Sequence, residues 1–270
     1  MLHPIRMSNS SSLPVVRLRR KFASGLLLVL ATLFAASGSL AQAPRVPVLV
    51  ELFTSEGCSD CPAADSLLER LDKEQFVPGA EVIVLSEHVT YWNYLGWRDP
   101  FSMQVLDARQ QVYGEHFGLG SIYTPQAVVD GGWQFVGSDE RRMRAAVAEA
   151  AAAPKTPLAL EEVHAGNGAV SFRVRGRIDL HARLFAALAA DATHSDVVRG
   201  ENAGRTLHHV AAVRGLHEFT GADVNGQTLS MASIESGATG SITGPLRLVV
   251  WVADARTGRV VSVAMQKLPR

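Results

Sequence analysis

Only two cysteines, Cys58 and Cys61, occur in this chain of 270 residues, and two thiolates are too few to complete a four-thiolate zinc site. No apolar run after residue 41 is long enough to span a membrane. Residues 1–41 hold five of the 26 basic residues and no acidic residue, which leaves 21 basic against 26 acidic residues. This slight acidic excess argues against nucleic-acid binding, which requires a basic face.

The amino-terminal segment has the pattern of a secretory signal peptide. A basic patch over residues 17–21 precedes an apolar run over residues 22–36, and residues 39–41 follow as a small-x-small cleavage signature. The apolar run is shorter than the roughly 20 residues that a membrane helix requires. We therefore expect residues 1–41 to be a cleaved signal peptide and the protein to be periplasmic or secreted, without a membrane span after cleavage. An uncleaved amino-terminal anchor is the alternative.

The next segment, residues 44–153, alternates strand and helix patterns. The apolar periodicity predicts strands over 46–53, 81–86, 126–129 and 133–136, and helices over 63–73, 100–116 and 138–153. Asp99 is the expected cap of the second helix. The order β-α-β-α-β-β-α, with a hairpin turn at Asp130-Gly131, predicts an α/β domain whose mixed sheet has helices on both faces.

A second, β-rich domain is expected over residues 158–270. The segment 154–157 contains two prolines and is typical of a linker. Short spacing between turn signals predicts a small β-sandwich, and the mature chain of about 230 residues is long enough for two domains. The strands are expected over 170–174, 183–190, 207–214, 246–253 and 260–265.

The two cysteines form a Cys-x-x-Cys motif between an expected strand and an expected helix, which is typical of a thiol–disulfide redox centre. Proline is tolerated only in the first turn of a helix, so Pro62 places the helix start near residues 59–60. Cys58 then lies at the amino-terminal tip, where free N–H groups and the helix dipole favour a thiolate. We therefore assign Cys58 as the nucleophile and Cys61 as the resolving thiol.

The surroundings of the motif also bear on its redox properties. Glu56 and Asp60 flank the cysteines, and nearby carboxylates raise the pKa of a thiol. We therefore expect a reduction potential below that of the strongest oxidant dithiols, which is about −120 mV. A disulfide across two intervening residues closes a very short loop and stabilises a fold little, which favours a redox role over a structural one.

A second motif, Thr124-Pro125, precedes the expected strand at 126–129. Together with the Cys-x-x-Cys at a helix start, this order resembles the thioredoxin-like superfamily, in which a cis-proline faces the two sulfurs. The resemblance implies a thioredoxin-like fold for residues 44–153, a cis Pro125, and a Thr124 backbone that helps to bind an extended substrate strand. The chain lacks the Trp-Cys-Gly-Pro-Cys of thioredoxin, which leaves the partner and the redox direction open.

Further motifs resemble those of one particular family of thioredoxin-like proteins. The segments 51–62, 88–101 and 123–126, together with Asp65, resemble a secreted bacterial family of thioredoxin-like proteins that is catalogued as a domain of unknown function. This resemblance covers most of the mature chain. It implies the fold and export rather than a substrate.

Two more residues are candidate binding residues. His88 follows the expected second strand, at the end where open α/β sheets bind ligands. It is either a proton shuttle near the sulfurs or a histidine held by local hydrogen bonds. Trp92 belongs to the aromatic loop 91–97, which is a recognition surface, a lid on its own domain or the seat of the second domain. Residues 199–204 are expected to form a turn.

These observations favour an exported thiol–disulfide oxidoreductase that acts on protein or small-molecule thiols and disulfides, with the Cys58–Cys61 disulfide in place of a bound cofactor. One alternative is a soft-metal protein that binds Cu(I) through the two thiolates and His88. Another is a non-catalytic thioredoxin-like binding module with a permanently closed disulfide. His208 and His209 are adjacent and point to opposite faces of an expected strand, which is unfavourable for joint metal binding.

Overall fold

The computed structural model describes residues 44–166, 168–179, 182–219, 226–232, 241–242 and 245–269. The expected signal peptide at 1–41 lies outside the described residues. By its contacts, the chain from Pro44 onward forms one compact unit.

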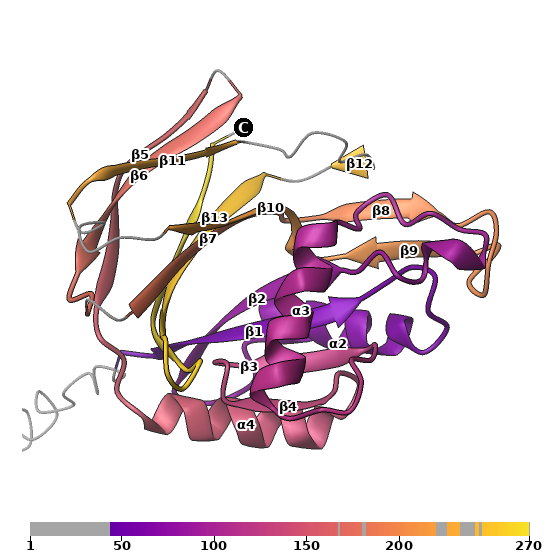
Figure 1. Cartoon of the computed structure of the whole chain (residues 1–270), viewed down its shortest axis with the longest axis horizontal. Helices are drawn as coiled ribbons and strands as arrows, with labels where there is room; N and C mark the ends of the chain where they lie inside the picture. Colours follow the sequence, from indigo (N-terminus) through magenta and orange to yellow (C-terminus); the bar gives the residue numbers. More distant parts are fainter. Residues whose placement is uncertain are drawn as a thin grey trace, which may run out of the picture. The chain divides into compact units, whose positions relative to one another are not determined.

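The first half follows the expected order of elements (Figure 1). The expected helix start at residue 100 is wrong, because Met103 has an extended backbone (φ −141°, ψ 139°) and the helix begins only at Gln104. The elements are β1 (Val46–Thr54), α2 (Cys61–Glu74), β2 (Ala80–His88), the 3₁₀ helix η1 (Asn93–Leu95), α3 (Gln104–His116), β3 (Gln126–Val129), β4 (Trp133–Val136) and α4 (Glu140–Ala152).

The second half consists of strands. The single strand expected at 207–214 is divided in two, because Ala211 has a φ of 50° and interrupts the extended backbone. The strands are β5 (Leu158–Gly166), β6 (Ala169–Gly176), β7 (Ala182–Ala190), β8 (Thr193–Asp196), β9 (Thr206–His209), β10 (Ala212–Phe219), β11 (Thr228–Ala232), β12 (Ser241–Ile242), β13 (Leu246–Asp254) and β14 (Val260–Lys267).

One sheet combines strands from both halves in the order β14-β13-β7-β10-β2-β1-β3-β4. β1 pairs with β2 in parallel and with β3 antiparallel, and β10 joins the sheet beside β2 where Ala212 pairs with Ser86. The expected linker at 154–157 is also bonded into the structure, since Lys155 pairs with Asp130 and Thr156 N–H donates to Val261 O at 2.9 Å. The two halves therefore share one sheet, where a two-domain chain was expected.

Alternate residues of β1 point to opposite faces of this sheet. Leu52 and Ala64 of α2 both lie within 3.2 Å of the position that a Cβ at Gly137 would occupy, so Leu52 points towards α2. Phe53 points the other way, and its ring packs edge-on against Tyr113 of α3 at 5.9 Å. Helices therefore lie on both faces of the first-half strands (Figure 1).

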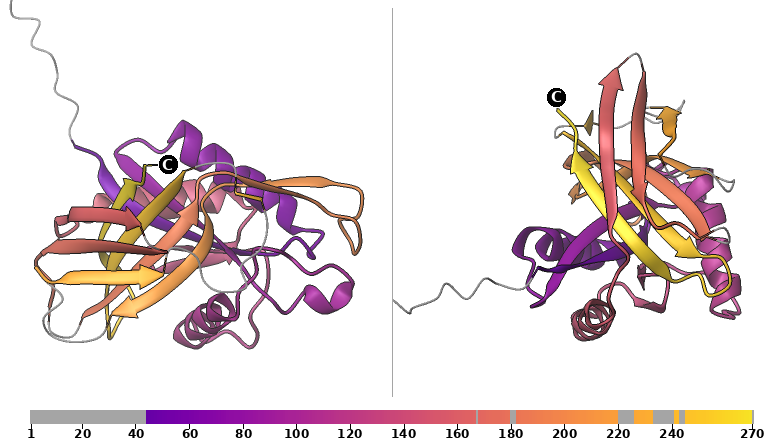
Figure 2. Two further views of the ribbon diagram at one scale, coloured as in Figure 1. Left: turned by 90° about the horizontal axis from the view of Figure 1, so that it is seen from above. Right: turned by 90° about the vertical axis from the view of Figure 1, so that its left-hand side faces the viewer.

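A three-stranded sheet, β11-β6-β5, packs on the part of the large sheet that the second half contributes (Figure 2). Phe172 of β6 lies in one apolar cluster with inward-facing residues of β7 and β13, namely Leu184, Ala186, Leu188, Leu248 and Val250. Phe185 and Trp251 point to the opposite face and stack at 5.3 Å. Because both faces are covered, β7 and β13 are almost continuously buried and apolar.

The strands β8 and β9 form a hairpin that pairs with β12 and stands apart from the large sheet. Figure 1 shows this hairpin in orange, extending from the second-half strands alongside the first half. Its connecting loop, residues 197–205, reaches the segment that joins β1 to α2, where Cys58 lies.

Candidate disulfide site

Cys58 and Cys61 form a disulfide with a Cα–Cα distance of 5.4 Å. Cys61 is the first residue of α2, Asp60 is its N-cap and Pro62 lies in its first turn, so the helix starts where the proline predicted. Cys58 is only 2% exposed and Cys61 is fully buried. A partner therefore reaches either sulfur only after neighbouring groups move.

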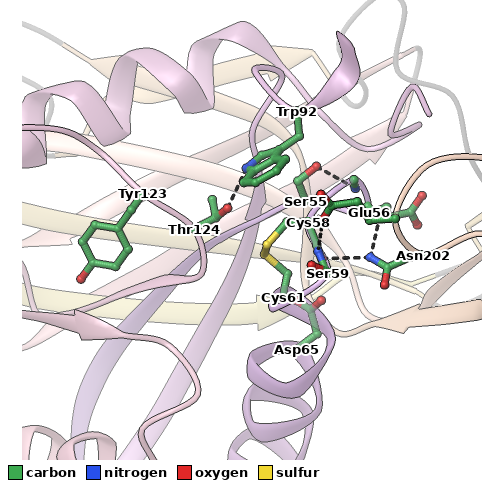
Figure 3. The surroundings of a disulfide bond; sticks show 12 residues. Ser55, Glu56, Cys58, Ser59, Cys61, Asp65, Trp92, Tyr123, Thr124 and Asn202 are labelled. Atoms are coloured by element: carbon green, nitrogen blue, oxygen red, sulfur yellow. Dashed lines mark hydrogen bonds between the residues drawn. A yellow bond between two sulfur atoms is a disulfide. The ribbon is translucent and has the colours of Figure 1, made fainter. Parts of the chain in front are cut away.

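Thr124 and Trp92 lie beside this disulfide (Figure 3). The Thr124–Pro125 peptide bond is cis, as the resemblance implied. Trp92 Nε1 donates a hydrogen bond of 2.7 Å to Thr124 Oγ1, and Figure 3 places both side chains next to the two sulfurs. A Cβ at Gly57 would lie 3.0 Å from Trp92 Cβ, so the absence of a side chain there allows the tryptophan to approach the cysteine loop.

His88 belongs to a buried polar cluster. Its Nδ1 lies 2.7 Å from Asp99 Oδ2, which also accepts a hydrogen bond of 2.9 Å from Glu56 N–H. Burial opposes ionisation of both side chains, but the partner's charge, the hydrogen bond between the two side chains and other nearby groups together outweigh it, so the pKa of His88 is raised and the pKa of Asp99 is lowered. The ring of His209 meets the ring of His88 edge-on at 4.4 Å.

Glu56 connects this cluster to the cysteine loop. Its carboxylate accepts hydrogen bonds from Trp97 Nε1 at 2.8 Å and from the Ser195 hydroxyl, and it lies 3.0 Å from His209 Nε2. The side chain is fully buried. These polar partners compensate for the loss of hydration of a carboxylate close to the disulfide.

Asp65 lies one helical turn after Cys61 on the same face of α2, and Figure 3 shows the two side by side. Burial raises the pKa of Asp65, although the nearby His209 and His88 oppose this effect. Asp65 Oδ2 is 3.8 Å from His209 Nδ1, and Asp65 Oδ1 has no hydrogen-bond partner among the residues that the structure describes. A protonatable carboxyl group therefore lies next to the disulfide.

The sequence did not predict that the β8–β9 loop contributes to this site. Asn202 Nδ2 donates to Cys58 O and to Glu56 O, both at 2.9 Å, and Glu201 Oε2 accepts from Ser59 N–H at 3.0 Å. The segment 199–204 has the composition of an ordinary turn, and no local signal reveals that its Asn202 is buried.

The described residues contain no group of three or more His, Cys, Asp or Glu side chains arranged to hold a metal ion. His208 is exposed and His209 is buried, as expected for neighbours on one strand. Within the same part of the chain, no helix is both long and apolar enough to cross a membrane.

The fold and site define a protein with a Cys-x-x-Cys disulfide at the start of a helix, on a mixed sheet that both halves of the chain complete. The chain belongs to the family described as "Protein of unknown function (DUF1223)", which matches residues 49–253. That match runs from β1 to β13 and so includes the β8–β9 loop.

A crystal structure of a protein from Agrobacterium tumefaciens is similar to this chain, with a TM-score of 0.59. The two share 23% sequence identity, and the similarity covers 83% of this chain and 95% of that one. This likeness supports a common fold. No curated protein matches the chain.

Proposed function

We propose that the protein is an exported thiol–disulfide oxidoreductase of thioredoxin-like character, with the Cys58–Cys61 pair as its redox centre. The observation that carries the proposal is the disulfide at the amino end of α2, with Thr124 and Trp92 beside it (Figure 3). Its substrates are protein or small-molecule thiols and disulfides, and it works in the periplasm or outside the cell.

The reductive half-reaction uses the two sulfurs in sequence. The Cys58 thiolate attacks one sulfur of a substrate disulfide, and the first substrate sulfur leaves with its electron pair and takes a proton. The Cys61 thiol then loses its proton and attacks Cys58 Sγ. The Cys58–Cys61 bond forms, and the second substrate sulfur leaves as a thiolate and is protonated. The reverse sequence oxidises a substrate dithiol.

The position of Cys58 supports its role as the attacking residue. It precedes the first turn of α2, where the N–H groups of the helix start and the helix dipole favour a thiolate. The burial of both sulfurs means that the substrate must displace part of the surroundings, and the Trp92–Thr124 contact is the nearest candidate. Displacement of Trp92 would expose Thr124 to an extended substrate strand.

Reduction of insulin or reactivation of a scrambled protein tests the proposal. The wild-type protein is expected to turn over, and Cys58→Ser is expected to be inactive. Cys61→Ser is expected to accumulate a mixed disulfide with the substrate, because the resolving thiol is missing. Equal activity of the wild type and Cys58→Ser would remove the proposed function.

A further inference from the structure

Two consecutive residues of the β8–β9 loop hold one peptide group of the disulfide loop. Asn202 is 1% exposed, and its amide donates to Cys58 O at 2.9 Å. Glu201 Oε2 accepts from Ser59 N–H at 3.0 Å. The carbonyl of Cys58 and the N–H of Ser59 belong to the same peptide group, so the loop binds both of its polar ends. Figure 3 shows the Asn202 side chain hydrogen-bonded to the backbone of the segment that contains Glu56 and Cys58.

These two hydrogen bonds restrict the orientation of Cys58. A peptide group is planar, so holding its C=O and its N–H restricts rotation about the single bonds on either side. One of these is the Cα–C bond of Cys58, and rotation about it changes the direction of the Cys58 side chain relative to Cys61. Asn202 also donates to Glu56 O at 2.9 Å, which holds the chain before Cys58 as well.

We propose that Glu201 and Asn202 are positioning residues that stabilise the Cys58–Cys61 disulfide relative to the dithiol. The proposal rests on the redox function proposed above. A disulfide forms more readily when its two sulfurs are already held close together, so a fixed Cys58 favours the closed bond. The Glu201 carboxylate acts in the same direction, because it disfavours a thiolate at Cys58 in the reduced protein.

Equilibration of the purified protein with glutathione tests the proposal. Two glutathione thiols become one glutathione disulfide, while the Cys58–Cys61 bond takes up the two electrons and two protons. Asn202→Ala is expected to shift this equilibrium towards the dithiol about tenfold, because two buried hydrogen bonds are lost. The corresponding rise in reduction potential is about 30 mV.

Glu201→Gln keeps an oxygen acceptor for Ser59 N–H and removes the charge. It is expected to shift the equilibrium in the same direction by about threefold, since the carboxylate is exposed and screened by water. Thr206→Ala is the matched control, because the Thr206 hydroxyl bonds to Asp196 within the same hairpin rather than to the disulfide loop. This control is expected to leave the equilibrium unchanged.

The potential separates positioning from a purely structural role. Loss of a residue that only stabilises the fold lowers the Tm of the oxidised and reduced proteins equally, and the reduction potential then stays constant. If Asn202→Ala does not fold, Asn202→Ser, which retains a hydroxyl donor, takes its place. Equilibrium constants for the Asn202 and Glu201 variants that match the Thr206→Ala control overturn the proposal.

The glutathione equilibrium requires no protein substrate, so its outcome is independent of turnover. Shifted potentials combined with inactivity on every protein disulfide would support the positioning roles and remove only the proposed function. Normal turnover with unchanged potentials would do the reverse.

Discussion

His88 Nδ1 lies 2.7 Å from Asp99 Oδ2, and both side chains are completely buried. The pKa of His88 is raised and the pKa of Asp99 is lowered, although burial opposes both charges. The charged forms therefore favour each other within the core. A buried pair of this kind becomes costly when one partner is removed, because the other charge is left without compensation.

Asp99→Asn is expected to destabilise the protein by about 3–5 kcal/mol near pH 5.5. Because the pKa of His88 is raised, the protonated histidine contributes fully to stability below its unfolded pKa of about 6.5, and this contribution is lost as the pH rises through the folded pKa. Because the pKa of Asp99 is lowered, its carboxylate contributes fully to stability above its unfolded pKa of about 3.9, and this contribution is lost as the pH falls through the folded pKa. The difference between wild type and variant should therefore be largest between about pH 4 and 6.5.

Urea unfolding from pH 4 to pH 9 measures this difference. Asp196→Asn, on the exposed end of β8, is the control and is expected to change stability by less than about 0.5 kcal/mol. A loss for Asp99→Asn that is the same at every pH would contradict the ion-pair explanation.

The sequence predicted the features that depend on neighbouring residues. Pro62 located the start of α2, because the restriction on proline acts within one helical turn. Asp130-Gly131 located the β3–β4 hairpin, and both residues adopt the positive φ that such a tight turn requires, 47° and 61°. The buried strands β1 and β2 were recognised from their continuous apolar runs.

The features that the sequence did not predict depend on distant partners. Asn202 and Cys58 are 144 residues apart, and a short polar loop carries no signal of what it will contact. Ala212 pairs with Ser86 across the expected domain boundary, so the continuity of the sheet was also hidden. Aspartate is a common helix cap, but the Asp99 carboxylate contacts His88 Nδ1 and accepts a hydrogen bond from Glu56 N–H.

Lys155→Met is expected to cost about 3 kcal/mol of unfolding free energy, because it leaves the buried Asp130 without its cationic partner. Burial raises the pKa of Asp130, and Lys155 opposes that effect. Adding Asp130→Asn should recover part of the loss by removing the unpaired charge.

Since the large sheet joins both halves, the protein should unfold in one step, and far-UV circular dichroism and tryptophan fluorescence should follow one coincident transition. Two separated transitions would show that the halves unfold independently.

Asp65→Asn is expected to change how stability depends on pH. Burial raises the pKa of Asp65, so the carboxyl group stabilises the fold fully below its unfolded value of about 3.9, and this contribution is lost as pH rises through the folded value. The asparagine does not ionise, so the free energy of unfolding of the variant should rise by about 1 kcal/mol relative to that of the wild type when the pH is raised from 4 to 8. Urea unfolding at pH 4 and at pH 8 measures this change. The control is Asp60→Asn at the exposed N-cap, and a similar gain there would refute the role of burial.

Trp92→Phe is expected to speed the reduction of the Cys58–Cys61 disulfide by dithiothreitol about fivefold, because the hydrogen bond to Thr124 Oγ1 is lost while most of the ring remains. Cys58 is 2% exposed, so reduction requires its surroundings to open. Thr124→Val removes the same bond and should give the same acceleration.

The double variant then tests whether the two side chains act through one contact. If they do, combining Trp92→Phe with Thr124→Val should add little to either single change, because the shared bond is lost only once. Tyr94→Phe is the matched control in the same loop, since Tyr94 is 80% exposed, and its reduction rate should equal that of the wild type. Trp92→Phe and Tyr94→Phe proteins that are reduced at the same rate would show that the contact between Trp92 and Thr124 does not limit access to the sulfurs.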